Sequence, residues 1–313
     1  MRKKLVSTIM AGLMGVMLAA CGSAEAKEPA STAEASTEAA PASAEATGAT
    51  EATSESAGAE SEVVSEDVQA IIDRGVLRVG VKNAVIGFGY EDPLTGEYSG
   101  LEIELAKALA GKLGVDVEFT AVTAATRTEL LDSGDIDCVL ATFTITDERK
   151  ESWDFTTPYY TDYVSVLVED SKGITTLENL VDATVGVSSG STSAKSLVSA
   201  MIEAGLISGD GFDPETFDPA TWTTGVKFQQ YDDYPTISTA LSAGEVDAFC
   251  VDKSILAIYK TEGRSYIDAE FSPQEYGIAT KKTSGLSAVT EELVTALLAD
   301  GTIDSLIKEN GLE

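Results

Sequence analysis

The chain has 313 residues, of which 43% are hydrophobic, so it is long enough for one large domain or two modest domains with buried cores. Its formal net charge of -31 argues against nucleic acid and anionic membrane surfaces as partners, and an anionic ligand would need a local cluster of basic side chains. It contains no histidine, which excludes histidine-based acid–base catalysis and histidine ligation of metals.

The three cysteines are Cys21, Cys138 and Cys250. Their spacing fits neither a metal site nor the disulfide framework of a small secreted protein. Cys138 and Cys250 are expected to be buried thiols that pack as small hydrophobic groups. We expect no bound metal ion and no cofactor.

Residues 1–20 have the pattern of a targeting segment, with basic residues at 2–4, an apolar run over 5–18 and then small residues. The apolar run is shorter than the ~20 residues that a membrane-spanning helix needs. Its end, Leu18-Ala19-Ala20-Cys21, resembles the bacterial lipobox. The resemblance implies that Cys21 is lipid-modified and becomes the mature N-terminus. The alternative is an ordinary secretory signal followed by an incidental cysteine.

Residues 21–66 are rich in Ala, Ser, Thr and Glu, with ten Glu against a single Lys and no aromatic residue. Such a segment cannot bury enough apolar surface to offset the entropy of ordering, so it is predicted to be a disordered tether. With ~40 residues of flexible chain, the tether would let the folded part range roughly 35 Å from the membrane.

From residue 67 onward, strand and helix patterns alternate. The expected strands are 76–81, 115–122, 136–142, 163–169, 184–188, 226–230, 246–251 and 276–279. The expected helices are 68–74, 101–113, 127–132, 191–204, 234–243, 287–298 and 303–308, with a helical turn at 177–180 and an extended loop at 207–224. This order predicts two α/β lobes with parallel sheets covered on both faces, the second lobe inserted into the first.

The stretch 142–162 concentrates groups that suit a small anion, because hydroxyls precede a charged turn at 147–150 and an aromatic and proline cluster. Arg149 offers a planar, two-pronged donor that matches a carboxylate. Thr142 and Thr144, two residues apart on an expected strand, would present their hydroxyls to the same side. The alternative for Arg149 is a surface ion pair with a neighbouring glutamate.

Several blocks of the sequence resemble one family. They are 142–150, Asp154-Phe155, Pro158-Tyr159-Tyr160, Gly80-Val81-Lys82-Asn83, Gly100-Leu101-Glu102-Ile103, Gly190-Ser191-Thr192, Val246-Asp247-Ala248-Phe249, Val251-Asp252-Lys253-Ser254 and Gln274-Glu275-Tyr276-Gly277-Ile278. Together, over about 74–312, they resemble the polar amino-acid-binding proteins that feed ABC importers. The resemblance implies an α/β, two-lobed periplasmic-binding-protein-like fold (type II), in which each lobe is a mainly parallel sheet with helices on both faces and two hinge strands cross between the lobes. Lobe 1 would comprise 67–162 and 274–313, and lobe 2 would comprise 163–273.

The resemblance also implies roles for the residues that match. Arg149 would clamp the α-carboxylate of an amino acid, helped by the hydroxyls of Thr142 and Thr144 and by backbone amides where a helix begins near Thr192. Asp252, at the end of an apolar strand, would hold the α-ammonium. A helix cap is the alternative for Asp252.

Selectivity for the side chain of the ligand is expected to depend on residues other than those that hold its α-carboxylate and α-ammonium. Lys82 and Arg127 match basic residues of the aspartate- and glutamate-binding relatives, and Tyr234 would add a hydroxyl or a packing contact. The resemblance therefore favours an acidic amino acid, whereas the alternative for either base is a solvated surface charge. Two departures from the family are Asp147, where many relatives have proline, and Ala124, where glutamine binders stack a phenylalanine.

The expected function is a monomeric, lipid-anchored substrate-binding protein on the outer face of the cell membrane. It would capture aspartate or glutamate between two closing lobes and deliver it to an ABC permease. One alternative is a binder of glutamine or another polar amino acid. Another is a dehydratase-type enzyme on the same fold, although the mapped pocket lacks a nucleophile–base pair and no catalytic residue is predicted. A sensory receptor is a third.

Overall fold

The computed structural model describes residues 64–313, which belong to one compact unit that runs from Glu60 to Glu313. The predicted signal segment, Cys21 and all but the last residues of the predicted tether lie outside the described residues. The helices are α1 Glu66–Arg74, α2 Leu101–Leu113, α3 Thr126–Ser133, α4 Asp147–Ser152, α5 Ser193–Glu203, α6 Tyr234–Ala243, α7 Lys253–Leu256, α8 Gly285–Ala299 and α9 Thr302–Glu309, with short 3-10 helices at Asp170–Lys172, Leu177–Leu180 and Ala257–Tyr259.

The strands are β1 Val76–Val81, β2 Ala84–Val85, β3 Gly89–Glu91, β4 Tyr98–Ser99, β5 Asp116–Ala121, β6 Cys138–Leu140, β7 Trp153–Phe155, β8 Tyr160–Glu169, β9 Thr184–Ser188, β10 Lys227–Tyr231, β11 Ala248–Asp252, β12 Arg264–Tyr266, β13 Phe271–Tyr276 and β14 Ala279–Lys281. No helix among residues 64–313 has the length and apolar character that crossing a membrane requires.

Lobe 1 is built on a sheet with the strand order β5-β1-β6-β14-β7. The strands β5, β1 and β6 are parallel, whereas β14 runs antiparallel to both of its neighbours. The helix α2 packs on this sheet because Leu101, Leu105 and Leu109, spaced by four residues, are fully buried. It ends at Gly114, which has the left-handed conformation (φ 70) typical of a helix C-terminus.

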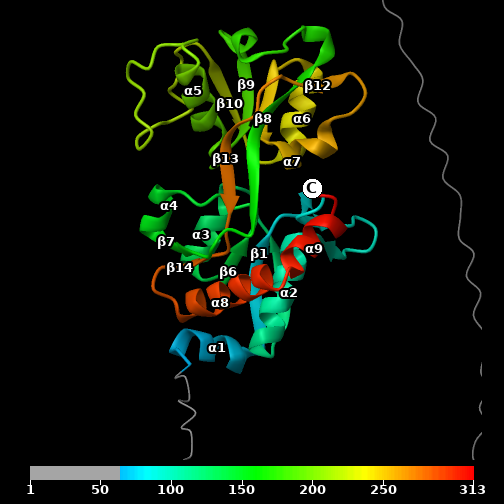
Figure 1. Cartoon of the computed structure of the whole chain (residues 1–313), viewed down its shortest axis with the longest axis vertical. Helices are drawn as coiled ribbons and strands as arrows, with labels where there is room; N and C mark the ends of the chain where they lie inside the picture. Colours follow the sequence, from blue (N-terminus) through cyan, green and yellow to red (C-terminus); the bar gives the residue numbers. More distant parts are fainter. Residues whose placement is uncertain (1–63) are drawn as a thin grey trace, which may run out of the picture. The chain divides into compact units, whose positions relative to one another are not determined.

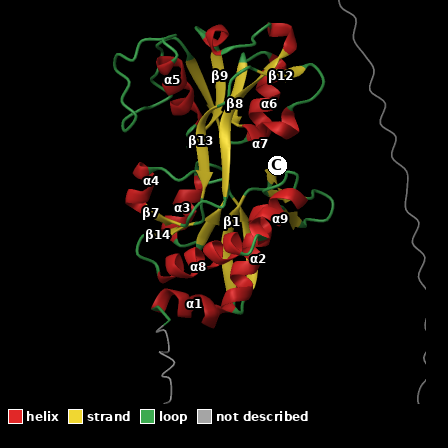
Figure 2. Ribbon diagram, in the orientation of Figure 1, coloured by secondary structure: helices red, strands yellow, loops and turns green. Residues whose placement is uncertain are grey.

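Lobe 2 is built on a second mixed sheet with the order β10-β9-β11-β8-β12, to which β13 is added by pairing with β8. The strands β10, β9 and β11 are parallel, and β8 runs antiparallel to β11. Figure 2 shows α5 and α6 beside this sheet in the upper part of the molecule and α1, α2, α8 and α9 around the sheet of lobe 1 in the lower part.

Two long strands, β8 and β13, run between the lobes side by side (Figure 1). They are antiparallel, with Tyr276 opposite Tyr160 and Phe271 opposite Val164. The two-lobed α/β architecture with crossing strands is confirmed, and the sheets are mixed because the crossing strands and β14 oppose the parallel core of each lobe. The exact residue bounds predicted for the lobes stay a prediction.

Three local predictions are wrong. The expected strand 276–279 is two strands, β13 and β14, because Ile278 leaves the ladder and donates its N–H to the Thr156 hydroxyl at 3.0 Å. The expected strand 136–142 is only β6, which ends at Leu140 and is followed by a bend at 141–142. The charged turn at 147–150 is the start of α4, which Thr146 caps by accepting the N–H of Arg149 at 3.1 Å.

Candidate functional site

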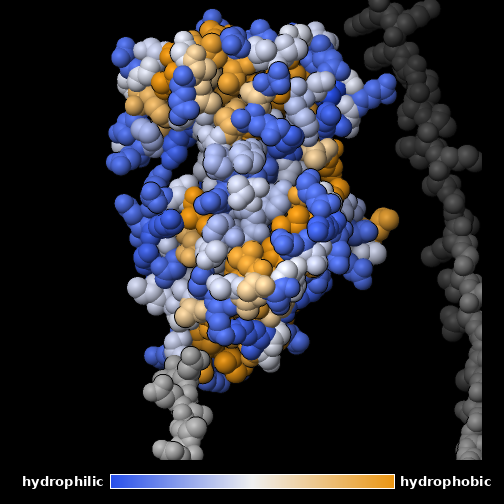
Figure 3. Space-filling model, in the orientation of Figure 1, coloured by the Kyte–Doolittle hydropathy of each residue, from blue (hydrophilic) through white to orange (hydrophobic). Residues whose placement is uncertain are grey.

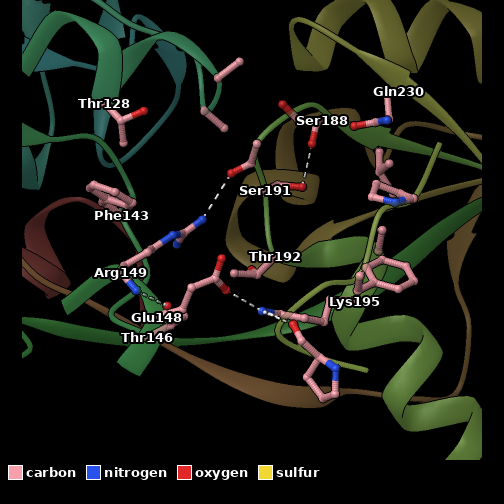
Figure 4. Close-up of a pocket in the computed structure, with 18 of the residues that line it drawn as sticks. Thr128, Phe143, Thr146, Glu148, Arg149, Ser188, Ser191, Thr192, Lys195 and Gln230 are labelled. Carbon is pink, nitrogen blue, oxygen red and sulfur yellow. Dashed lines mark hydrogen bonds and ion pairs between the residues drawn. The ribbon is translucent and has the colours of Figure 1, made fainter. Parts of the chain in front are cut away.

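The predicted site residues come together where the two lobes face each other. One small pocket is lined by six of the eight, namely Arg127, Thr142, Thr144, Thr192, Tyr234 and Asp252. Lys82 lines a second pocket of about 300 Å³ that shares Tyr234 with the first. Arg149 lines a third pocket of about 1050 Å³, shown in Figure 4, which shares Thr192 with the first.

Two basic side chains in this region, Lys82 and Arg127, are buried, and a third, Arg149, is half-buried. Lys82 and Arg127 are only 4% and 3% exposed, so the prediction that they are more than solvated surface charges is supported by their burial. Arg149 lies in the third pocket between the lobes, and the surface ion pair considered for it is absent among the described residues. Within residues 64–313 none of the three forms an ion pair, although the carboxyl groups of Glu102 and Asp252 favour the charged forms of Lys82 and Arg127 from a longer distance.

The two guanidinium groups are held by backbone carbonyls and by one aromatic ring. Arg127 donates from Nη1 to the carbonyls of Ala141 and Thr142, at 2.8 and 3.1 Å. Arg149 donates from Nη1 to the Thr144 carbonyl at 2.7 Å. The Phe143 ring centroid lies 3.9 Å from Cζ of Arg127 and 4.7 Å from Cζ of Arg149, so this ring packs against both.

Burial makes each of these charges costly. It lowers the pKa of Lys82 well below the usual value, with nearby Arg127 adding to the effect. Burial is also the main cause that lowers the pKa of Arg127, and burial together with Arg127 lowers the pKa of Arg149 to about 9. A ligand carboxylate would oppose these shifts, so an anion is the kind of ligand whose binding most reduces the free-energy cost of burying the three bases.

Thr142 adopts a strained backbone that the sequence pattern did not predict. Its φ of 45 is in the left-handed region, which is unfavourable for a β-branched residue. The strain is offset on both sides of the residue, because Glu102 accepts the Thr142 N–H at 2.6 Å and Arg127 donates to the Thr142 carbonyl. The Thr142 hydroxyl is buried without a hydrogen-bond partner among the described residues and lines the first pocket.

The hydroxyls of Thr144 and Thr192 meet at one acceptor. Thr144 in lobe 1 and Thr192 in lobe 2 donate to Oε1 of Gln274, at 2.9 and 2.7 Å. Neither Thr142 nor Thr144 lies on a regular strand, since β6 ends at Leu140, so the predicted reason for their common orientation is wrong. Both nevertheless line the first pocket, at the turn where Thr142 has its left-handed backbone.

The lobes approach each other closely beside Arg149. Its Nη2 donates to the carbonyl of Gly190 in lobe 2 at 3.1 Å. Gly190 has φ 74, and a Cβ placed there would lie 2.8 Å from the Ala124 carbonyl oxygen of lobe 1. Only glycine allows this approach, so position 190 permits the closed arrangement of the lobes.

Asp252 ends β11 and is 5% exposed. Its side chain makes no capping bond to α7, so the helix-cap alternative is not observed; it instead accepts a hydrogen bond from the hydroxyl of Tyr276. The same hydroxyl lies 3.3 Å from Oδ2 of Asp162. Burial and the neighbouring Asp162 raise the pKa of Asp252 to about 7.

Four residues of this region were not predicted as site residues: Glu102, Phe143, Gln274 and Tyr276. Gln274 and Tyr276 could have been found, because residues two apart on a strand share a face. Glu102 is an acidic residue in line with the apolar face formed by Leu105 and Leu109, and it is fully buried. Nothing in the sequence around Phe143 distinguishes it from an ordinary aromatic residue of the core.

Residues 77–311 match the model of the bacterial extracellular solute-binding proteins, family 3. The chain belongs to this family. Its similar relatives include the ABC transporter glutamine-binding protein GlnH of Bacillus subtilis (32% identical over 80% of this chain and 86% of the relative) and the glutamate-binding protein GluB of Corynebacterium glutamicum (31%, 77% and 80%). As a family 3 member the chain is an extracytoplasmic amino-acid-binding protein of an ABC transporter.

Solved structures support the fold of this solute-binding protein. An ancestral arginine-binding protein bound to arginine is 32% identical, with a TM-score of 0.62 over 75% of this chain and 98% of the other. The ancestral amino acid-binding protein AncCDT-1, a precursor of cyclohexadienyl dehydratase, is 30% identical, with a TM-score of 0.63 over 77% and 98%. The relatives thus share the fold but differ in the amino acid that their names record.

Proposed function

We propose that this family 3 solute-binding protein captures an acidic amino acid, aspartate or glutamate, and delivers it to an ABC permease. In this proposal Arg149, Thr144 and Thr192 hold the α-carboxylate, Asp252 holds the α-ammonium, and Lys82 and Arg127 receive the side-chain carboxylate. Thr142 and Tyr234 complete the wall of the pocket.

The observation that carries the proposal is the state of Lys82. The Lys82 side chain is only 4% exposed, its ammonium lies 5.4 Å from the ring centroid of Tyr234, and it has neither an ion pair nor a hydrogen bond among the described residues. A buried, unpaired ammonium is costly, and only a carboxylate or another strong acceptor offsets that cost. A glutamine side chain offers one neutral oxygen, whereas glutamate offers a full negative charge.

The charges of the pocket favour the same ligand. Lys82, Arg127 and Arg149 contribute three positive charges to the adjoining pockets, and Asp252 is the acidic residue that lines the same pocket as Arg127. Other carboxylates line the outer pockets, namely Asp232 and Asp233 beside Lys82 and Glu148 and Glu215 beside Arg149, but none of them forms an ion pair with the three bases. An acidic amino acid brings two carboxylates and one ammonium, so it pairs with Asp252 and neutralises two of the bases. A neutral amino acid leaves two bases unpaired, and a basic amino acid adds another positive charge.

Titration calorimetry of the purified protein with the twenty amino acids tests the assignment. We expect aspartate or glutamate to bind at least about 30-fold more tightly than glutamine and asparagine, which corresponds to about 2 kcal/mol for one charge-assisted pair. Tighter binding of glutamine or of a basic amino acid would contradict the roles of Lys82 and Arg127. Mass spectrometry of the bound compound also tests the dehydratase alternative, which requires a product.

The second part of the proposal is the anchor. We infer that Cys21 carries a lipid and that residues 22–62 tether the binding domain to the outer face of the cell membrane, where the domain acts as a monomer. Replacing Cys21 by Ser is expected to move the protein from the membrane fraction to the soluble fraction without changing its affinity for the amino acid. Retention of Cys21→Ser in the membrane fraction would contradict lipid anchoring.

Binding is expected to weaken at acid pH. The pKa of Asp252 is raised to about 7 in the ligand-free protein, so its carboxylate takes up a proton as the pH falls below 7. The ligand ammonium binds the ionised form, and binding must therefore displace that proton. The dissociation constant should rise by up to about tenfold per pH unit between pH 7 and pH 5, as proton linkage requires. Calorimetry at pH 8, 7, 6 and 5 checks this.

At alkaline pH the affinity for the ligand is expected to fall as the pH rises. Burial lowers the pKa of Lys82, and a ligand carboxylate favours the charged ammonium, so affinity should fall again as Lys82 loses its proton at high pH. Asp252→Asn should bind weakly with no acid limb, and Lys82→Met should lack the alkaline limb. An affinity that stays constant from pH 8 to pH 5 in the unaltered protein would contradict the role of Asp252.

A further inference from the structure

The segment 207–224 contains two consecutive copies of a five-residue pattern, Asp-Pro-x-Thr-aromatic, at 213–217 and 218–222. Both copies fold into the same turn. Asp213 accepts the N–H of Glu215 at 3.0 Å, and Asp218 accepts the N–H of Ala220 at 2.8 Å. Within the loop expected at 207–224 there are therefore two tandem turns, which we call the tandem-turn segment (residues 213–222).

The aromatic residues that end the two turns pack together. The ring centroids of Phe217 and Trp222 are 5.7 Å apart, and Phe212 lies 5.5 and 5.8 Å from them. Phe217 also contacts Phe228 on β10, at 6.3 Å. These contacts fix the tandem-turn segment on the apolar core of lobe 2.

The tandem-turn segment positions a lysine toward lobe 1. Lys195 is on the first turn of α5, and its ammonium donates a hydrogen bond to the carbonyl of Pro214 at 3.2 Å. The same ammonium pairs with Oε2 of Glu148 on α4 at 3.0 Å. One side chain of lobe 2 is therefore held by the tandem turns and bonded to the helix that carries Arg149.

No other ion pair of the described residues joins the two lobes. The remaining nine pairs each lie within a single lobe. Figure 3 shows hydrophilic side chains that span from one lobe to the other on the side of α4 and α5, beside an opening between the lobes. Figure 4 shows the pair of Glu148 and Lys195 at the edge of the pocket that contains Arg149.

We propose that Lys195 is a positioning residue that acts as a latch for the closed, ligand-bound state. This inference rests on the proposed function, the capture of an amino acid between two closing lobes. The tandem-turn segment lowers the entropy cost of the latch, because the bond to Pro214 already orients the Lys195 ammonium before the lobes meet. The latch forms only on closure, so it slows release of the ligand and leaves the rate of entry unchanged.

Stopped-flow measurement of ligand dissociation from the full protein tests the latch. Lys195→Met should release the ligand about two- to fivefold faster, as expected for an ion pair near the surface, with an unchanged association rate. The matched control is Lys172→Met, because Lys172 pairs with Asp247 at the same distance, 3.0 Å, within lobe 2. Equal dissociation rates for Lys195→Met and the unaltered protein would overturn the proposal.

Two further variants separate a latch from a loss of folding. The exchange Glu148→Lys with Lys195→Glu should restore slow release, whereas either change alone should accelerate it. Asp213→Ala, which disrupts the turn that presents the Pro214 carbonyl, should accelerate release more than Asp218→Ala in the second copy of the turn. If the exchange fails to restore slow release although circular dichroism shows a folded protein, the latch is wrong.

A cross-linking measurement, made with and without the preferred amino acid, distinguishes failure of the latch from failure of the proposed function. Carbodiimide coupling joins a carboxylate and an amine as an amide, and the carbodiimide takes up the water. It should link Glu148 to Lys195 more extensively when the amino acid is bound than when it is absent, and peptide mass spectrometry detects the product. Absence of this cross-link in a protein that binds an amino acid would overturn the latch alone. If no amino acid binds, the proposed function fails. A Glu148–Lys195 cross-link found in that case still supports the contact between the lobes, whereas no cross-link would reject the contact as well.

Discussion

Replacing Arg149 by Ala is expected to remove measurable binding of every amino acid, whatever its side chain. The Arg149 guanidinium contacts lobe 2 through the Gly190 carbonyl and can offer two donors to an α-carboxylate beside Thr192. Removing one partner of a buried, hydrogen-bonded charge pair costs about 2–5 kcal/mol, or a 30-fold to several-thousand-fold rise in the dissociation constant. Calorimetry with the preferred amino acid and with one neutral amino acid measures the loss.

The control for Arg149→Ala removes an arginine that has an ion pair but lies away from the site. Arg74 pairs with Asp137 in lobe 1 and is partly exposed, so Arg74→Ala should leave binding unchanged. Arg149→Lys should recover only part of the affinity, since an ammonium lacks the two parallel donors. Binding by Arg149→Ala within fivefold of the unaltered protein would contradict the clamp.

Folding of the site depends on contacts across the chain as well as on local pattern. The sequence predicts β1, β9 and α2 at the same residues as the structure because local signals, such as Gly75 and Gly114, end or bound these elements. The turn at Thr142 could not be predicted, because Glu102 and Arg127, which hold it, act from other elements. Likewise, Thr144 and Gln274 are 130 residues apart, and only the crossing strands bring them together.

The sequence identified the candidate ligand-binding residues but not the contacts that hold them in place. The resemblance identified Lys82, Arg127, Arg149 and Asp252, and the structure places all of them at adjoining pockets between the lobes. Sequence alone does not show that three bases lack ion pairs while Asp252 shares the Tyr276 hydroxyl with Asp162. That imbalance depends on burial, which only the packed structure defines, and it is the basis for expecting an acidic ligand.

Replacing Lys82 by Met is expected to raise stability and to lower selectivity for acidic amino acids. The ligand-free protein has the Lys82 side chain buried and without an ion pair among the described residues, and burial lowers its pKa. Methionine fills a similar volume without a charge, so the free energy of unfolding should rise by about 1–3 kcal/mol. For a protein of this size each 1 kcal/mol raises Tm by about 2–4 °C. Calorimetric unfolding without ligand measures this gain.

The same substitution should cost ligand affinity. Without the Lys82 ammonium the side-chain carboxylate of aspartate or glutamate loses one charged partner, and affinity should fall by about 2–4 kcal/mol, a 30- to 1000-fold rise in the dissociation constant. Glutamine should lose much less, so the preference for glutamate over glutamine should shrink by more than tenfold. Lys107→Met is the control, because Lys107 is on the surface of α2 and pairs with Glu104.

The two effects of Lys82→Met must appear together, because both arise from one buried charge. A binding site that holds a charge unpaired until the ligand arrives gives up stability for affinity, so removal of the charge reverses both. If Lys82→Met lowers Tm and leaves the preference for glutamate unchanged, Lys82 is a structural residue of lobe 1. The acidic selectivity would then have to come from Arg127, which is held by the Ala141 and Thr142 carbonyls and keeps a buried, unpaired Nε.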